Sequence, residues 1–242
     1  GCVLRREDAM EKIKNIRKKL RHQRSVRRRK LGLSTPTQII CVSFIIVIAL
    51  GTLLLTLPIA SRHGRLDVLN AMFTATSATC VTGLVVRDTW SQFTWFGQAV
   101  VLLLIQVGGL GLVTLTSFFA LAMRRRMGFR DLRLLGESVS ADGYDQAKSV
   151  LKIVVGLAAM FEGIGILLLL FAFVPQFGLE GIWISVFTAI SAFCNAGFDL
   201  FGRFGAYSSL APYVNNYYVQ AVIMFMIISG GLGFMVWVEL CQ

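Results

Sequence analysis

Two short segments of the chain carry residue types that suit cation binding by backbone oxygen atoms. The segment FTATSATCVTGL (Phe73–Leu84) returns 114 residues later as FTAISAFCNAGF (Phe187–Phe198), and seven of the twelve positions are identical. Both copies contain a stretch of small residues that closes on glycine, and neither holds a histidine or a carboxylate for acid–base chemistry. Glycine permits backbone conformations closed to other residues, and exposed carbonyl oxygens can replace the hydration shell of a cation. The repeated segments therefore predict a cation site made of main chain.

Each repeated segment lies at the end of an apolar stretch that is too short to cross a bilayer. These stretches are Leu66–Thr79 and Gly181–Phe193, and apolar runs of about 10–14 residues are typical of re-entrant elements. Non-helical backbone is tolerated at membrane depth only where it is buried in protein or lines a watery cavity. The C-terminal end of each short helix also directs about half a negative charge at the backbone that follows. We therefore expect two short helices that enter the membrane, each followed by a return segment.

The composition of the chain is that of an integral membrane protein. Of its 242 residues, 55% are hydrophobic and only 15% are charged, whereas soluble domains carry about a quarter charged residues. No Asp, Glu, Lys or Arg occurs in Leu31–Ser61, Thr89–Met123 or Phe204–Val238, and Glu162 alone interrupts Ile153–Leu179. A helix needs about 20 apolar residues to span a bilayer. We predict an all-α polytopic membrane protein with spanning helices near Gln38–Leu57, Phe96–Ala122, Val150–Phe173 and Asn216–Glu239.

The spans and the short helices form an internal repeat of span, re-entrant helix and span. Both second spans contain the sequence GGLG, at Gly108–Gly111 and Gly230–Gly233. The two units keep the same order and direction, as in parallel repeats. Small residues let membrane helices approach closely, and glycine can also act as a hinge; we favour packing. The predicted organisation is a basic arm over 1–37, a first repeat over 38–123, a cytoplasmic loop over 124–149 and a second repeat over 150–242.

The net charge of +11 is concentrated in two segments of the chain. Residues 1–37 hold 13 Lys and Arg and 124–149 hold six, whereas 59–94 hold three and 175–213 hold one. Because basic residues mark cytoplasmic loops, both termini and the middle loop are predicted to be cytoplasmic. The basic arm adjoins a span, so we expect it to contact anionic lipid or a partner subunit rather than nucleic acid.

The repeated motifs resemble those of a known transporter superfamily. TATSATCVTGLVVRDTW, FTAISAFCNAGFDLF and the two GGLG-containing spans resemble the Trk/Ktr/HKT potassium transporters, most closely the bacterial Ktr-type membrane subunit. The likeness covers roughly residues 35–240. It implies four membrane–pore-helix–membrane repeats arranged around one pore, of which this chain holds two. We therefore expect the chain to be the N-terminal half of a longer transporter, and the alternative is that two such chains pair.

The resemblance also implies a selectivity filter in the two repeated segments, with filter glycines at Gly83 and Gly197. The implied K+-binding residues, which act through backbone carbonyls, are Cys80, Val81, Thr82 and Gly83 in the first repeat and Cys194, Asn195, Ala196 and Gly197 in the second. In plant relatives a serine at the first filter glycine accompanies sodium transport, so Gly83 favours potassium. The implied function is potassium uptake across the plasma membrane, without a cofactor other than the transported ion. Sodium coupling, that is symport, varies within the family and stays open.

Ktr-type membrane subunits work as dimers on a cytosolic ring of nucleotide-binding, RCK-type subunits. By resemblance we expect a homodimer here, with Arg124–Asp145 and the N-terminal arm facing such a ring. Two other interpretations stay open: a fragment that does not transport by itself, and a membrane scaffold or enzyme built on the same spans. An enzyme has little support in the sequence, because His22 and His63 are isolated and the five cysteines lack metal-ligand spacing.

Three acidic residues have two interpretations each. Glu162 is the only acid in the interior of a predicted span; intramembrane charges point to function, but it could instead pair with a polar group on a neighbouring helix. Asp88 and Asp199 follow the repeated segments closely. Acids at the outer mouth would concentrate cations there, or they could form loop salt bridges with Arg87 and Arg203.

Overall fold

The computed structural model describes residues 36–124, 142–232 and 236–237, and the regular elements in these ranges are helical. They are α2 (Pro36–Leu55), η1 (Pro58–Ala60), α3 (Val68–Thr79), α4 (Thr89–Gln92), α5 (Trp95–Arg124), α7 (Asp142–Phe177), α8 (Leu179–Phe193), η2 (Phe201–Arg203), η3 (Ala211–Tyr213) and α9 (Tyr217–Gly231). The predicted all-α class is confirmed. The basic arm up to residue 35, most of the predicted loop 124–149 and Gly233 lie outside the described residues.

The chain divides into two compact parts, Gly1–Ile46 and Val47–Gln242. The described residues of the first part form the N-terminal portion of α2. Every contact discussed below lies within the second part, which holds both repeated segments.

The helices follow the apolar runs of the sequence, except that α7 is longer than predicted and α9 ends at Gly231, whereas the predicted end of the fourth span at Glu239 lies outside the described residues. Both ends of α2 and of α5 lie within two residues of their predicted positions. The helix α7 begins at Asp142, eight residues before the predicted start at Val150, so its first turns lie inside the predicted loop 124–149. A helix satisfies its own backbone hydrogen bonds, and it can therefore continue beyond the apolar stretch that first defines it.

The helices present apolar side chains outward. Leu103 on α5 is 66% exposed and Phe171 on α7 is 76% exposed, which suits a lipid environment better than water. Within the described residues, Lys152–Phe177 is both long and apolar enough to cross a membrane. Shorter apolar helices cover Cys41–Leu55, Trp95–Gly111, Leu179–Phe193 and Tyr217–Gly231.

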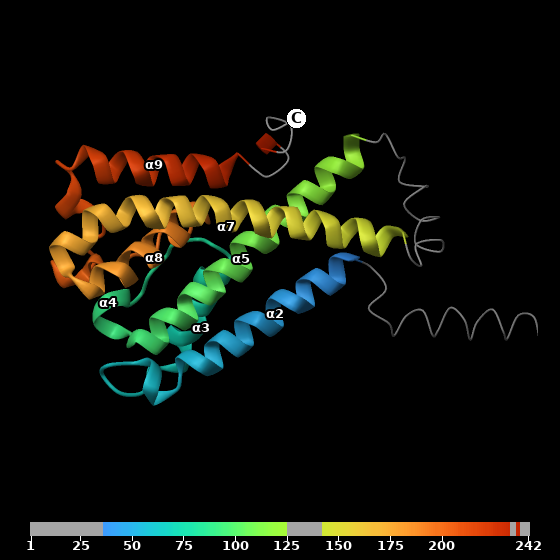
Figure 1. The fold of residues 1–242 in the computed structure, drawn as a ribbon. Helices are drawn as coiled ribbons and strands as arrows, with labels where there is room; N and C mark the ends of the chain where they lie inside the picture. Colours follow the sequence, from blue (N-terminus) through green and yellow to red (C-terminus); the bar gives the residue numbers. More distant parts are fainter. Residues whose placement is uncertain (1–35, 125–141, 233–235, 238–242) are drawn as a thin grey trace, which may run out of the picture. The chain divides into compact units, whose positions relative to one another are not determined.

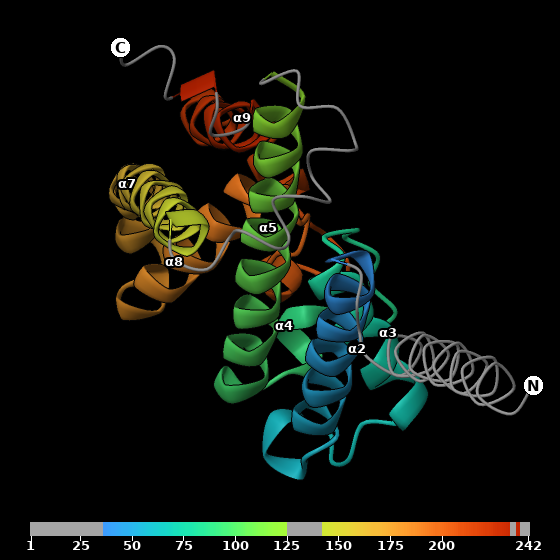
Figure 2. The ribbon, with the colours of Figure 1, turned by 90° about the vertical axis from the view of Figure 1, so that its right-hand side faces the viewer.

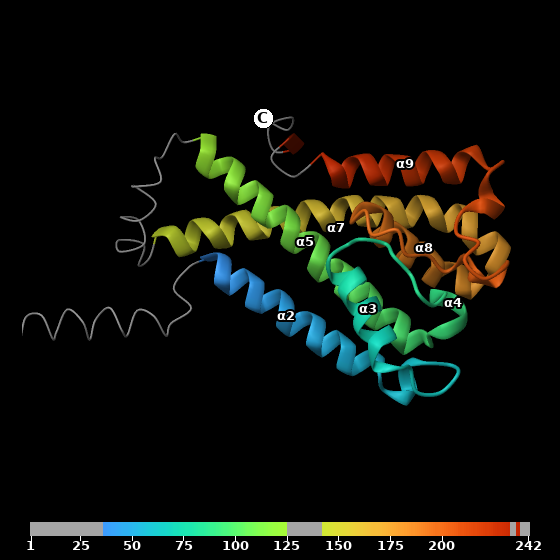
Figure 3. The ribbon, with the colours of Figure 1, turned by 180° about the vertical axis from the view of Figure 1, so that it is seen from behind.

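The short helices pack against the long ones. The helix α3 packs against α5, while α7, α8 and α9 pack against one another (Figures 1 and 3). Figure 2 shows α5 between α3 and α8, and α5 contacts both. The ends of the two short helices are thereby brought to the same long helix.

A tight corner turns α7 back into α8. Gly178 separates the two helices with a left-handed φ of +60°. On α8, Gly181 lies directly against the carbonyl oxygen of Phe173, where a Cβ atom would overlap it. The corner lets α8 run back alongside α7 and ends it beside α5.

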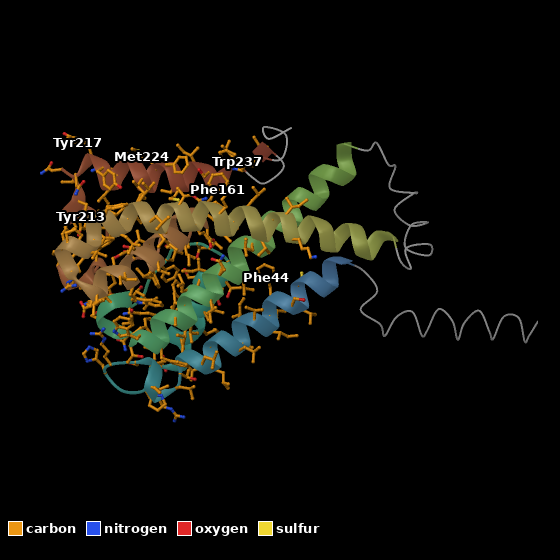
Figure 4. All side chains as sticks on the ribbon, viewed as in Figure 1. Phe44, Phe161, Tyr213, Tyr217, Met224 and Trp237 are labelled. Atoms are coloured by element: carbon orange, nitrogen blue, oxygen red, sulfur yellow. The ribbon has the colours of Figure 1, made fainter. Side chains whose placement is uncertain are left out.

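Aromatic contacts hold the segment that follows α8. The ring of Phe173 on α7 lies 5.5 Å from that of Phe201 and 5.4 Å from that of Tyr213, both in edge-on geometry. Such pairs stabilise beyond the area that they bury. Nearer the start of α7, the ring of Phe161 lies 4.6 Å from that of Trp237 (Figure 4). The loop after the second repeated segment is therefore anchored to α7.

Candidate cation-binding site

The first bend, Cys80–Gly83, begins where α3 ends. Val81 has a left-handed φ of 56°, and its N–H donates to the carbonyl oxygen of Ala78 at 3.3 Å. The N–H of Thr82 donates to the carbonyl oxygen of Ser77 at 3.0 Å. This is the Schellman pattern of helix ends, in which glycine usually holds the left-handed position. Because a left-handed backbone costs a residue with a Cβ atom about 1–2 kcal/mol, the first bend stores strain at Val81.

The second bend, Cys194–Gly197, follows α8 with the same backbone pattern. Asn195 has a φ of 58°, and its N–H donates to the carbonyl oxygen of Ala192 at 3.0 Å. The N–H of Ala196 donates to the carbonyl oxygen of Ser191 at 2.8 Å. Asn195 occupies the position equivalent to Val81, and asparagine adopts the left-handed conformation more readily than valine. The repeated sequence thus produces a repeated backbone.

The two bends meet at their glycines. Gly83 and Gly197 both have a φ of +72°. A Cβ atom built on Gly83 would lie 2.6 Å from the carbonyl oxygen of Ala196 and 3.4 Å from the Cα of Gly197. A Cβ built on Gly197 would lie 3.5 Å from the Cα of Gly83. The positions that the sequence singles out are therefore adjacent in space, although they are 114 residues apart.

The eight predicted site residues differ in exposure. Thr82, Asn195 and Gly197 are exposed, Ala196 is fully buried, and the others are half-buried. Within the described ranges, no group of three or more His, Cys, Asp or Glu side chains is placed to hold a metal ion. A cation at the bends would therefore depend on oxygen atoms of the main chain.

The first glycine of each GGLG sequence supports one bend. Gly108 on α5 lies against the carbonyl oxygen of Thr79, the last residue of α3. Gly230 on α9 lies in the same way against the carbonyl oxygen of Phe193, the last residue of α8. A side chain at either position would overlap that oxygen, which confirms the predicted packing role for these two glycines. The hinge alternative has no support in this geometry.

A polar cluster lies behind the second bend. The side-chain amide of Gln106 on α5 donates to both carboxylate oxygens of Glu162 on α7, at 2.8 and 3.1 Å. The thiol of Cys194 donates to Oε1 of Gln106 at 3.9 Å. Glu162 is only 8% exposed, and its pairing with a polar group on a neighbouring helix is confirmed. Sequence reasoning missed Gln106, whose one signal is an amide directly before VGGLG in an apolar run.

The two acids beyond the bends bind backbone N–H groups. Asp88 is 9% exposed, and its carboxylate accepts from the N–H of Ser91 at 2.8 Å and of Tyr207 at 3.2 Å. Asp199 accepts from the N–H of Phe201 at 2.9 Å. Burial raises the pKa of Asp199, and the nearby charge of Asp88 raises this pKa further. Of the two basic residues considered as partners, Arg203 instead pairs with Glu180 at 3.1 Å.

The acid of the first repeat reaches across to the second. A Cβ atom on Gly202 would overlap the carboxylate of Asp88, so these two residues are in close contact. Gly202 lies in η2, within the segment that follows the second bend. The segments that follow the two bends are thus in direct contact, which the sequence alone did not predict.

A cavity of about 190 Å³ adjoins the second bend. Its polar lining includes Thr188, Ser191, Asn195, Asp199 and Ser209. The Thr188 hydroxyl is buried without a hydrogen-bond partner. The lining therefore offers both a hydroxyl and a carboxylate beside the return segment.

The chain matches a known protein family over most of its length. The family model TrkH, described as a cation transport protein, matches residues 11–242. A membrane protein of this class agrees with the outward-facing apolar helices. The chain belongs to the TrkH family of cation transport proteins, so the predicted Trk/Ktr relationship is confirmed.

Several curated proteins are similar to this chain over most of its length. It is 38% identical over 205 residues to the potassium/sodium uptake protein NtpJ of Enterococcus hirae, covering 84% of this chain and 44% of NtpJ. It is 39% identical over 203 residues to the Ktr system potassium uptake protein B of Bacillus subtilis, covering 84% and 44%. The equivalent protein of Vibrio alginolyticus is 38% identical over 200 residues, covering 82% and 43%. The chain thus spans less than half the length of these relatives.

Proposed function

We propose that this chain supplies two membrane–pore-helix–membrane repeats of a potassium uptake protein, and that K+ passes along the carbonyl groups of the two bends. In this proposal α3 and α8 are the pore helices, and Cys80–Gly83 and Cys194–Gly197 are two segments of the filter. The observation that carries the proposal is the contact between Gly83 and Gly197 at the ends of two matched helices. A filter needs such segments side by side, and only glycine fits where their backbones approach this closely.

Electrostatics supports the same assignment. The C-terminal end of a helix carries about half a negative charge, and both α3 and α8 end at a bend. Two partial negative charges would therefore lie close to one position, without the desolvation cost of a buried carboxylate. This arrangement favours a cation that has lost part of its hydration shell.

Two bends can surround only part of a dehydrated ion. The relatives are more than twice as long as the matched region, so we expect the remaining filter segments to come from a further part of the protein. Pairing of two copies of this chain around one pore is the alternative source. In either case we expect a single copy of this chain to conduct no ions.

The names of the relatives support a proposal for the ion and for the direction of transport. Those reported above are named as potassium or potassium/sodium uptake proteins, and we propose K+ uptake across the plasma membrane, driven by the membrane potential. Sodium coupling is a second, separable part of the proposal. We further propose that both termini and the loop 124–149 face the cytosol, that the complete protein forms a homodimer, and that the loop meets a cytosolic nucleotide-binding subunit.

The proposal is tested by potassium uptake in a strain that lacks its own uptake systems. The complete protein should restore growth at low potassium, and Gly83→Ser and Gly197→Ser should each lower K+ uptake and weaken discrimination against Na+. Gly64→Ser is the matched control, because Gly64 also has a positive φ, +88°, but has no neighbour within 4 Å of a built Cβ. If both filter variants retain wild-type flux and K+/Na+ discrimination at equal abundance, the bends are not the filter.

A further inference from the structure

The polar cluster formed by Gln106, Glu162 and Cys194 lies in an otherwise apolar environment. It joins three elements, since Gln106 lies on α5, Glu162 on α7 and Cys194 at the end of α8. Burying a carboxylate among apolar helices is costly unless its hydrogen bonds are satisfied. A pair of apolar residues would serve packing alone at lower cost. The pair therefore calls for an explanation other than stability.

The polar pair joins the two repeats and has no counterpart at the equivalent positions. The position equivalent to Glu162 in the first repeat, 114 residues earlier, is Ile48. Gln106 stands two residues before the first glycine of its GGLG sequence, and the same place in the second repeat is Ile228. The cysteines, by contrast, occur in both repeats, at Cys80 and Cys194. The repeat architecture thus accepts apolar residues at both positions, and the polar pair is specific to the junction of α5 with α7.

The pair fixes the orientation of the Gln106 amide. A carboxylate only accepts hydrogen bonds, so Glu162 holds the NH₂ group of Gln106 on its own side. The amide oxygen is then directed to the thiol of Cys194, which it meets at 3.9 Å. The thiol also packs against Gly109 on α5, since a Cβ atom built there would lie 2.6 Å from its sulfur atom. Cys194 is therefore held between the amide of Gln106 and the backbone of α5.

The second bend has greater need of such support than the first. In the first bend the hydroxyl groups of Ser77 and Thr82 lie 2.9 Å apart and tie the helix end to the return segment. The second bend has Ala196 in place of Thr82, and Ser191 donates instead to the carbonyl oxygen of Phe198. No hydroxyl pair equivalent to that of the first bend exists in the second.

We propose that Glu162, acting through Gln106, is a positioning residue that sets the placement of Cys194 and thereby the cation discrimination of the second bend. This inference rests on the proposed function, because it gives the second bend a role in selecting the ion. Neither Glu162 nor Gln106 contacts the ion in this account. Their effect is to fix the carbonyl groups at the start of the second bend.

The experiment measures K+ and Na+ uptake by the complete protein in proteoliposomes, with protein content and thermal stability recorded for each variant. Gln106→Leu and Glu162→Leu should each reduce the K+/Na+ uptake ratio by roughly tenfold, equivalent to about 1.4 kcal/mol of discrimination. Gln106→Glu, which places two carboxylates together, should reduce it at least as much. The exchanged pair Gln106→Glu with Glu162→Gln should restore the ratio, because the amide at 162 can donate to the carboxylate at 106, which still accepts from Cys194. Ile228→Leu is the control at the equivalent position of the second repeat and should leave the ratio unchanged.

The outcomes separate this inference from the proposed function. If the leucine variants change stability or abundance while the K+/Na+ ratio stays at the wild-type value, or if the exchanged pair fails to restore the ratio, the positioning role is wrong. If Gly83→Ser and Gly197→Ser also leave the ratio unchanged in the same vesicles, the filter assignment itself fails. A changed ratio for the glycine variants with an unchanged ratio for Gln106→Leu rejects the positioning role alone.

Discussion

The first and second bends reach one backbone conformation with different side chains. The left-handed residue is Val81 in one and Asn195 in the other, with φ values of 56° and 58°. Both glycines that close the bends have a φ of +72°. Valine is a poor choice for this conformation and asparagine a better one, yet the two backbones agree. The hydrogen bonds of the helix end and the closing glycine, rather than the side chains between them, therefore determine the shape of the bend.

The bends differ in what holds them in place. The first is tied locally, through the hydroxyl groups of Ser77 and Thr82. The second is tied to other helices, through Cys194 to Gln106 and through the side-chain amide of Asn195, which donates to the carbonyl oxygen of Ile227 at 3.4 Å. The two bends thus share one shape but have separate supports, so substitutions at the supports of one bend should leave the other largely unaffected.

The largest expected difference between the bends concerns their glycines. Gly83→Ala should reduce Rb+ uptake by the complete protein to background, because its Cβ would strike the carbonyl oxygen of Ala196 at 2.6 Å in addition to straining the backbone. Gly197→Ala should retain measurable uptake, since its nearest described neighbour is the Cα of Gly83 at 3.5 Å.

Gly64→Ala is the control for backbone strain alone, because Gly64 has a positive φ but a Cβ atom built there has no neighbour within 4 Å. Uptake should be measured per amount of protein in the membrane. If Gly197→Ala lost as much uptake as Gly83→Ala, or more, the contact between the bends would not be the one described.

A smaller and symmetric effect is expected at the supporting glycines. Gly108→Ala and Gly230→Ala should each destabilise the protein by about 1–3 kcal/mol, as overpacking does, because each Cβ overlaps the last carbonyl oxygen of a short helix. Thermal unfolding in detergent would measure the loss. Gly156→Ala on α7, where a built Cβ has no neighbour within 4 Å, should be neutral or slightly stabilising. A loss confined to one of the two supporting positions would contradict their equivalence.

The left-handed position of the second bend should tolerate glycine better than a β-branched residue. Asn195→Val should lower stability by about 1 kcal/mol, since it introduces into the second bend the strain already present at Val81. Asn195→Gly should cost less, because glycine adopts the same φ freely. The difference in melting temperature between these two variants is the relevant quantity. Equal melting temperatures would mean that the strain is relieved by movement of the bend.

The weakest expected effect is a pH dependence of stability at Asp199, in the segment that follows the second bend. Burial raises the pKa of Asp199 above its ordinary value of 3.8. The folded protein then binds the proton more tightly than the unfolded chain, so this carboxyl group costs stability as the pH rises above that ordinary value through the raised pKa. Asp199→Asn should therefore be more stable than the wild type near neutral pH, and the difference should shrink toward pH 4. Melting temperatures measured across this range would test it; a difference that grows on acidification would contradict the assigned direction.

The sequence predicted the elements well because apolar runs and glycine patterns are local signals. Repetition of a twelve-residue segment predicts the two bends, and recurrence of GGLG in both second spans predicts the role of its glycines. Two features depend on tertiary packing and left no such signal. The contact between Asp88 and Gly202 joins the segments that follow the two bends, and the partnership of Gln106 with Glu162 depends on how α5 packs against α7. Neither appears until the helices are placed in space.

The account is tested most directly by locating a bound ion in crystals of the complete protein. Rb+ or Tl+ can replace K+ and be identified by anomalous scattering. The account predicts a peak beside the two bends, coordinated by carbonyl oxygens from Cys80–Gly83 and Cys194–Gly197. A peak confined to the cavity around Asp199, or the absence of any peak beside glycines that still face each other, would contradict it.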